Sequence, residues 1–135
     1  MTSFKPRIQS MHMKTLLDTN FLLIPGKFRV DIFTELERFG KPRLYTIDLV
    51  VSELKIIAQD KGSDAGHARL GLELIVKKGV NVLETGGEHA DDEITDLAAR
   101  EGYTVCTQDT GLQKILKGKG VRVVALRQES RLEIV

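Results

Sequence analysis

The chain has 135 residues, 41% of them hydrophobic and 5% aromatic, and its 20 Lys and Arg against 19 Asp and Glu give a formal net charge of +1. This length predicts one domain with enough apolar surface for a core. No apolar run approaches the roughly 20 residues that span a bilayer, and residues 1–14 have no apolar centre typical of a signal peptide. The single cysteine, Cys106, excludes an internal disulfide and a multi-cysteine zinc site. We therefore expect a cytoplasmic protein with no membrane partner.

Charge is distributed unevenly along the chain. Residues 1–14 carry a net charge of +3 and residues 112–135 carry +4, whereas residues 84–101 hold seven acids and one base and carry −6. An acidic centre between basic flanks suits a metal-dependent enzyme that acts on a polyanion, and a solvated acidic helix face is the alternative. The near-neutral total therefore does not exclude a nucleic-acid partner.

The elements are predicted in chain order. Residues 1–12 are expected to form a flexible extension, with Met13 as an alternative start, and residues 13–135 to form a single domain. The expected strands are 14–18, 44–47, 80–83, 103–107 and 121–126. The expected helices are 30–39, 48–59, 63–78, 90–101 and 109–116. Pro25-Gly26 is expected to break the chain.

Alternation of strands with helices predicts βαβ units and a parallel sheet that is covered on both faces. We expect an α/β fold of three layers, α/β/α, around a central parallel sheet of four to five strands. Such sheets place their ligand sites at the carboxyl ends of the strands. The polar residues at those ends are therefore the candidates for function.

Acids follow two of the predicted strands. Asp18 closes the first strand, and Asp109 follows the fourth. Either acid has a local alternative, Asp18 in an Asx turn and Asp109 as a helix cap. Thr19 and Asn20, directly after Asp18, can hydrogen-bond the loop and orient its carboxylate, or hold a metal-bound water.

Acids on two predicted helices point toward the same edge. On the helix after the second strand, Glu53 falls on the apolar side between Val50 and Ile56, where it either reaches the crevice or lies at the rim of the core. On the acidic helix, Asp91 extends the buried side into the first turn. Asp92 points away, and the helix macrodipole explains it better.

Together these positions direct four carboxylates toward one crevice: Asp18, Glu53, Asp91 and Asp109. Four carboxylates at close range cannot all stay ionised without compensation, and a divalent cation is the usual remedy. Oxygen ligands favour Mg²⁺ or Mn²⁺ over zinc, and the scattered histidines offer no zinc spacing. Asp92 is kept as the alternate ligand to Asp91.

Four segments resemble, in order, the motifs of PIN-domain ribonucleases: Leu16–Leu22, Ile47–Leu54, Ala90–Ile94 and Val105–Leu112. The likeness runs from about residue 14 to residue 126, with all four acids in family order. The stretch 18–38 is most similar to archaeal PIN proteins related to the eukaryotic nucleases that process small-subunit pre-rRNA. VapC-type toxins form the neighbouring branch.

This resemblance implies a PIN-like fold and a divalent-metal-dependent endoribonuclease acting in rRNA processing. The four carboxylates would be catalytic and would hold one or two Mg²⁺ or Mn²⁺ ions. Thr107 would position the scissile phosphate or a metal-bound water, unless it is a plain strand residue. Bases after the fourth motif would contact the RNA backbone, or be ordinary surface bases: Lys114, Lys117, Lys119 and Arg122. The low aromatic content argues against base stacking along long single strands.

Two other functions stay open. A VapC-type toxin ribonuclease would share the size and chemistry and would pair with a small antitoxin, whereas a PIN-fold RNA-binding or scaffold protein would keep the fold without cleavage. The sequence contains neither a P-loop nor a dinucleotide-binding glycine motif. We expect RNA as the partner, a homodimer by family likeness, and either an antitoxin or a ribosome-assembly protein.

Overall fold

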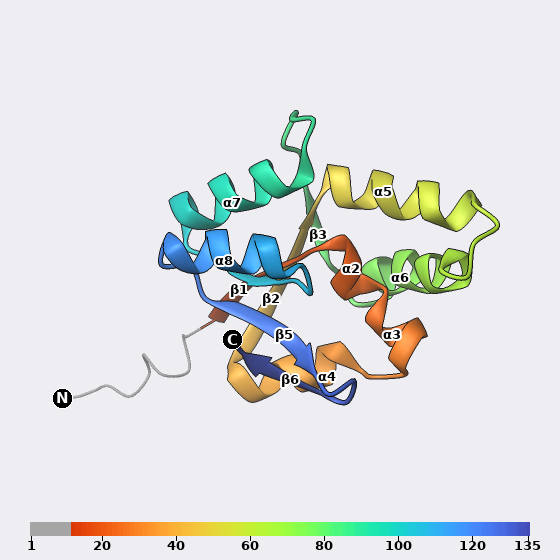
Figure 1. The fold of residues 1–135 in the computed structure, drawn as a ribbon, viewed down its shortest axis with the longest axis horizontal. Coiled ribbons are helices and arrows are strands. Elements are labelled where there is room, and N and C mark those ends of the chain that lie inside the picture. The colour runs from red at the N-terminus through yellow and green to blue at the C-terminus, as the bar shows by residue number, and fades with distance from the viewer. Residues whose placement is uncertain (1–11) are drawn as a thin grey trace.

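The computed structural model describes residues 12–135, built around a six-stranded sheet of order β3-β2-β1-β4-β5-β6 (Figure 1). The expected extension at residues 1–12 lies outside the described residues, except for His12, which begins the first strand. The strands are β1 (His12–Leu17), β2 (Lys41–Ile47), β3 (Asn81–Leu83), β4 (Thr104–Cys106), β5 (Val123–Arg127) and β6 (Arg131–Ile134). The helices are α2 (Thr19–Leu22), α3 (Ile24–Phe28), α4 (Ile32–Leu36), η1 (Glu37–Phe39), α5 (Asp48–Gln59), α6 (Ala65–Lys77), α7 (Ala90–Glu101) and α8 (Thr110–Gly118).

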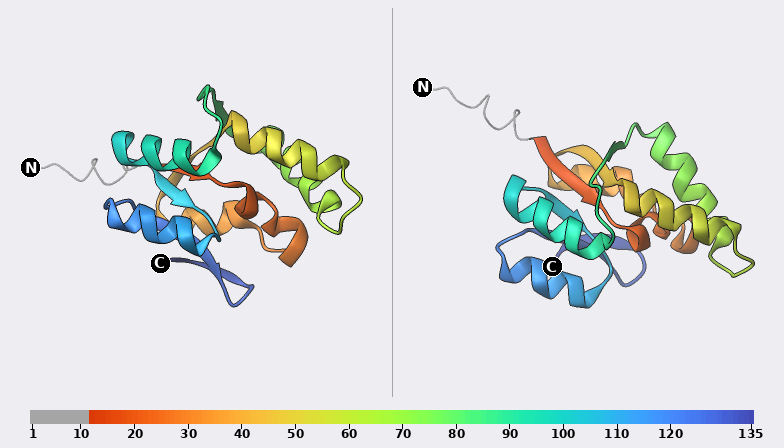
Figure 2. Two further views of the ribbon diagram at one scale, coloured as in Figure 1. Left: turned by 45° about the horizontal axis from the view of Figure 1, so that its top comes forward. Right: turned by 90° about the horizontal axis from the view of Figure 1, so that it is seen from above.

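Five strands, from β3 to β5 across the sheet, pair in parallel. The predicted α/β fold with a central parallel sheet is confirmed. Helices α5 and α6 lie together on one side of β1 and β4, and α7 and α8 lie together on the other (Figure 2). Because both faces are covered, the central strands are apolar throughout, and Leu16, Leu17 and Val105 have no exposed surface.

The sequence did not predict the sixth strand. β6 pairs antiparallel with β5 and closes a hairpin in which Arg127 lies opposite Arg131. Gln128 and Glu129 in its turn adopt positive φ values of 54° and 56°. Such turns are normally marked by Asn or Gly, so this one has no recognisable turn signal in the sequence.

The expected break at Pro25-Gly26 is wrong. Pro25 lies in the first turn of α3, where its missing N–H group is not needed for the helix. The helix expected at residues 30–39 is also shorter and divided into α4 and η1. Asp31 caps α4 through Oδ1, which accepts hydrogen bonds of 3.1 Å from the N–H groups of Phe33 and Thr34.

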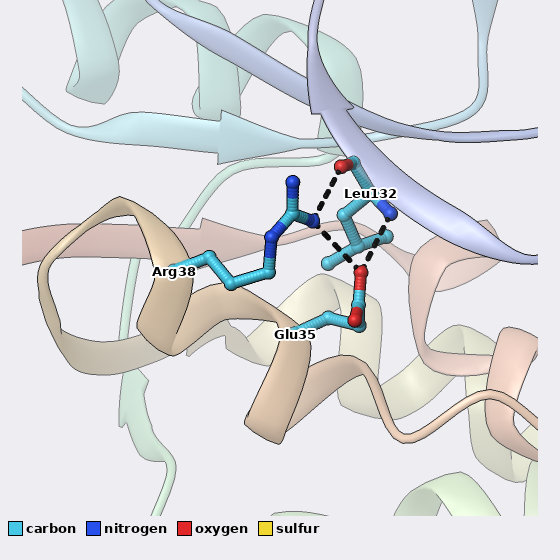
Figure 3. A network of polar contacts seen from close by, with 3 residues as sticks. All are labelled: Glu35, Arg38 and Leu132. Carbon is cyan, nitrogen blue, oxygen red and sulfur yellow. Dashed lines mark hydrogen bonds and ion pairs between the residues drawn. The ribbon is translucent and has the colours of Figure 1, made fainter.

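Two side chains of the first crossover cover the edge of β6 (Figure 3). Oε1 of Glu35 accepts a hydrogen bond of 3.1 Å from the N–H group of Leu132. Nη1 of Arg38 donates to Glu35 Oε1 at 2.9 Å and to the carbonyl oxygen of Leu132 at 3.0 Å. These contacts satisfy both backbone groups of Leu132 and block strand addition at that position.

Among residues 12–135, no helix combines the length and the apolar character needed to cross a bilayer.

Replacing Glu35 with alanine should lower the free energy of unfolding by about 1–2 kcal/mol, because the part-buried Leu132 N–H group loses its acceptor. Urea denaturation would measure this change. Glu37→Ala is the matched control, because Glu37 is exposed on the neighbouring turn and makes no side-chain ion pair among the described residues. An equal loss of stability in both variants would contradict the assigned role of Glu35.

Candidate active site

The sheet changes direction between β1 and β4. From β1 the chain moves outward through β2 to β3, and it then returns to β4 on the other side of β1. In open parallel sheets, ligands bind beyond the carboxyl ends of the strands at such a switch point. Asp18 follows β1 and Thr107 follows β4, so both lie at this point. The N–H group of Asp18 donates to the carbonyl oxygen of Cys106 at 3.0 Å and joins the two strand ends.

Asp18 is a buried carboxylate, with 5% of its surface exposed. Oδ1 accepts a 2.8 Å hydrogen bond from the N–H group of Thr19, and Oδ2 accepts a 2.7 Å hydrogen bond from the hydroxyl of Thr107. Burial raises the pKa of Asp18, the two hydrogen bonds lower it, and the charges of Asp91 and Glu53 raise it further. The pKa of Asp18 is raised overall, so keeping Asp18 ionised costs free energy.

A buried polar network fixes the position of this carboxylate. The Thr107 hydroxyl, which has no exposed surface, donates to Asp18 and accepts a 3.1 Å hydrogen bond from the N–H group of Asp109. Oδ1 of Asn20 accepts a 2.9 Å hydrogen bond from the N–H group of Gln108. The Thr107 hydroxyl is therefore directed at Asp18, and Asn20 connects the loop after β1 to the loop after β4.

Two glutamines that the sequence interpretation missed extend this network. The side-chain amide of Gln108 pairs with both backbone groups of Leu126, as a neighbouring strand would. Nε2 donates to the carbonyl oxygen of Leu126 at 3.2 Å, and Oε1 accepts from the Leu126 N–H group at 2.6 Å. Nε2 of Gln113 donates to the carbonyl oxygen of Thr107 at 2.8 Å. Gln108 lies within the fourth motif, but nothing in the sequence indicates a partner 18 residues away.

Glu53 reaches the site from α5. Its Oε1 accepts a hydrogen bond from the hydroxyl of Thr19, the residue next to Asp18. The predicted position of Glu53, between Val50 and Ile56, lies at the boundary of the buried face: Val50 is fully buried, whereas Ile56 is 70% exposed. Glu53 itself is exposed, so this one hydrogen bond is what ties it to the site.

Asp91 and Asp109 complete the group of acids. The pKa of Asp91 is raised by partial burial, and the charges of Asp109, Glu53 and Asp92 raise it further. Asp109 also caps α8, because its Oδ1 accepts a 3.0 Å hydrogen bond from the N–H group of Leu112. Asp109 therefore both caps α8 and raises the pKa of Asp91 by its charge. Asp91 is coupled by charge to each of the other three acids.

Comparison with known proteins identifies the family of the chain. The sequence profile described as a PIN-like domain matches residues 15–129. The chain belongs to the PIN-like domain family. The resemblance drawn from the four motifs is thereby confirmed.

Relatives and solved structures agree with this membership. The chain is 27% identical over 118 residues to Ribonuclease VapC9 of Archaeoglobus fulgidus, covering 87% of this chain and 85% of that protein. Its fold is similar to the PIN domain endonuclease Utp24, with a TM-score of 0.76, 20% identity and 90% of each chain covered. It is also similar to a domain of a functionally unknown protein from Methanocaldococcus jannaschii, with a TM-score of 0.64, 18% identity, and 85% of this chain and 91% of that chain covered.

The four acids of the PIN-like domain would offer oxygen donors to a cation. The acids at this edge raise the pKa of Asp18 and Asp91, and Glu53, Asp91 and Asp109 are exposed at the surface. Within residues 12–135, no three or more His, Cys, Asp or Glu side chains are arranged to hold a metal ion. The donor chemistry fits a hard divalent cation such as Mg²⁺ or Mn²⁺.

The predicted RNA-binding bases do not all lie beside these acids. Lys114 and Lys117 are exposed on α8. Lys119 lines a groove of about 320 Å³ between α7 and α8, together with Asp91 and Asp92. Arg122 lines a different groove, at the amino ends of the strands. The fold therefore divides a set of bases that are close in sequence.

Replacing Asp18 with asparagine should raise the free energy of unfolding of the metal-free PIN-like domain at pH 7. The pKa of Asp18 is raised on folding, so between about pH 4 and that raised value the folded state binds more protons, and stability falls as pH rises. The advantage of the variant should shrink as pH falls toward 4. Urea denaturation in EDTA across pH 4 to 7.5 would measure it.

Asp31→Asn is the control of opposite sign. Hydrogen bonds from Thr34 lower the pKa of Asp31, so its ionised form adds stability that is present at pH 7 and is lost as pH falls. The Asp31 variant should therefore be less stable than wild type at pH 7. An Asp18 variant that is also less stable at pH 7 would show that its lost hydrogen bonds outweigh the cost of burying its charge.

Proposed function

We propose that this PIN-like domain is a divalent-metal-dependent endoribonuclease that hydrolyses RNA phosphodiester bonds. One observation carries the proposal: Asp18 is buried at the switch point of the sheet, the charges of Asp91 and Glu53 raise its pKa, and the charge of Asp109 raises the pKa of Asp91. The acids are Asp18, Glu53, Asp91 and Asp109. A relative that is itself named a ribonuclease supports the proposal.

The same four residues would hold Mg²⁺ or Mn²⁺. When bound, such an ion supplies a more acidic water and positive charge for the oxygens of the scissile phosphate. The chain supplies the orientation. Thr107 holds Asp18 through Oδ2, and Thr19 holds Glu53 through Oε1. Asp109 stands at the start of α8, where its cap hydrogen bond fixes its carboxylate.

Raised pKa values at the site fit this role. Burial and the charges of neighbouring acids raise the pKa of both Asp18 and Asp91, so both are costly to ionise. A divalent cation would offset that cost, and the network around Thr107 would keep the carboxylates placed until the cation binds. Asp91, rather than Asp92, is the proposed ligand from α7, since its pKa responds to both Asp109 and Glu53.

Incubation of a structured RNA with the protein and Mn²⁺ or Mg²⁺ should give cleavage, followed on a denaturing gel. Asp18→Asn and Asp91→Asn should each lower the rate by about 100-fold or more, because each removes a charged ligand. Asp92→Asn is the matched control on the same turn of α7 and should stay within a few-fold of wild type. Equal cleavage by wild type and Asp18→Asn would sink the assignment, and RNA binding without cleavage would favour a scaffold protein.

For the biological role, we infer rRNA processing, which the resemblance of residues 18–38 to archaeal relatives of pre-rRNA-processing nucleases supports. The likeness to Ribonuclease VapC9 supports the alternative, a toxin ribonuclease with an antitoxin partner. In either role the protein would act on RNA in the cytoplasm, as a homodimer.

Depletion of the protein in its own cells separates the two roles. A processing nuclease should leave unprocessed small-subunit rRNA precursor, detected by Northern blot. A toxin should leave rRNA unchanged on depletion and should arrest growth when overproduced, an effect that Asp18→Asn would abolish. A ribosome-assembly protein or a small antitoxin recovered with the tagged chain would identify the corresponding partner.

A further inference from the structure

We propose that a groove at the amino-terminal edge of the sheet binds a short single-stranded stretch of RNA. This amino-edge groove lies between the starts of β1 and β2 and the segment α4–η1, at the opposite end of the strands from the four carboxylates. Its volume is about 1130 Å³. That exceeds the roughly 300–1,000 Å³ of small-molecule sites and suits a segment of a polymer.

The rim of the amino-edge groove is basic. Four bases line it, Lys41, Arg43, Lys78 and Arg122, and the acid among its lining residues is Glu37. Among the described residues, none of these four bases forms an ion pair. Lys41 and Arg43 are exposed and alternate along β2, so both project from the same face. Unpaired bases along one groove complement the phosphates of a polyanion.

The floor of the groove is apolar and includes aromatic surface. Phe39 and Pro42 are half-buried there, whereas Phe33 is buried beneath Lys78, whose Nζ lies 5.6 Å from the centre of the Phe33 ring. Basic groups that contact the backbone, combined with flat apolar groups that contact unpaired bases, are the pattern of single-strand binding sites. Phe39 is the phenylalanine of this floor that keeps exposed surface, so stacking there would fit a short stretch of RNA rather than a long one.

The groove and the proposed cleavage site lie at opposite ends of the strands. The six residues of β1 separate the two edges, about 20 Å at roughly 3.3 Å per residue. The carboxyl edge is acidic and, without a cation, repels RNA, so attraction in the metal-free protein would come from the amino edge. This inference rests on the proposed function for the choice of RNA, and it extends the substrate to a strand that reaches from one edge to the other.

The test measures binding without cleavage. A labelled 20-nucleotide oligouridylate would be titrated with the full chain in EDTA, with fluorescence anisotropy as the readout. The double variant Lys41→Gln/Arg43→Gln should bind at least 10-fold more weakly. The slope of log K against log salt should fall in magnitude by about 1.4, for two lost phosphate contacts on a single strand. Lys78→Gln, on a different element, should also weaken binding.

Lys55→Gln/Lys61→Gln is the matched control, because both lysines are exposed at α5 and its end, outside the groove. It should stay within about two-fold of wild type. Equal weakening in both double variants, or in neither, would overturn the proposal. Displacement of the RNA by poly-glutamate as readily as by unlabelled RNA would overturn it in favour of an acidic protein, and tighter binding of duplex RNA would overturn the single-strand assignment.

The two proposals can fail separately. Groove-dependent binding in EDTA with no cleavage in Mn²⁺ would remove the nuclease proposal and leave the groove. Cleavage by wild type together with unchanged binding by Lys41→Gln/Arg43→Gln would remove the groove and leave the nuclease.

Discussion

The hydrogen bond from Thr107 to Asp18 is the contact on which the rest of the site depends. Both residues are buried where β1 and β4 meet, and a buried carboxylate without donors is strongly unfavourable. The same hydroxyl accepts a hydrogen bond from the N–H group of Asp109. One side chain therefore connects the first and fourth motifs and orients Asp18, the acid of the first motif.

Opposite charges lie at opposite ends of the strands. The carboxyl edge gathers acids whose charges raise the pKa of Asp18 and Asp91, whereas the amino edge gathers bases that form no ion pair within the described residues. The near-neutral total of +1 conceals this polarity. A polyanion and a divalent cation are the ligands that such a distribution complements. Keeping the buried Asp18 ionised at the carboxyl edge costs free energy. Burial of the apolar central strands offsets this cost.

Sequence reasoning succeeded where the signal was local. Hydrophobic periodicity predicted the five parallel strands and the helices at 48–59 and 90–101, because it depends on residues that are neighbours along the chain. It failed where a residue acted outside its usual preference. Pro25 lies in the first turn of a helix where a chain break was expected. Gln128 and Glu129 adopt left-handed conformations without the Asn or Gly that normally marks them. The covered edge of β6 also depends on Glu35 and Leu132, which are 97 residues apart.

The sequence alone determined which acids stand after strands or in the first turns of helices, and in which order, because strand ends and helix turns are set by neighbours along the chain. Only the tertiary structure decided what those acids contact. Thr107 lies 89 residues from Asp18, and Thr19 lies 34 residues from Glu53. Tertiary structure also placed Lys119 and Arg122, which are three residues apart, in two different grooves. Such contacts depend on which strands become neighbours, and the order of strands in a sheet is fixed by packing over the whole domain.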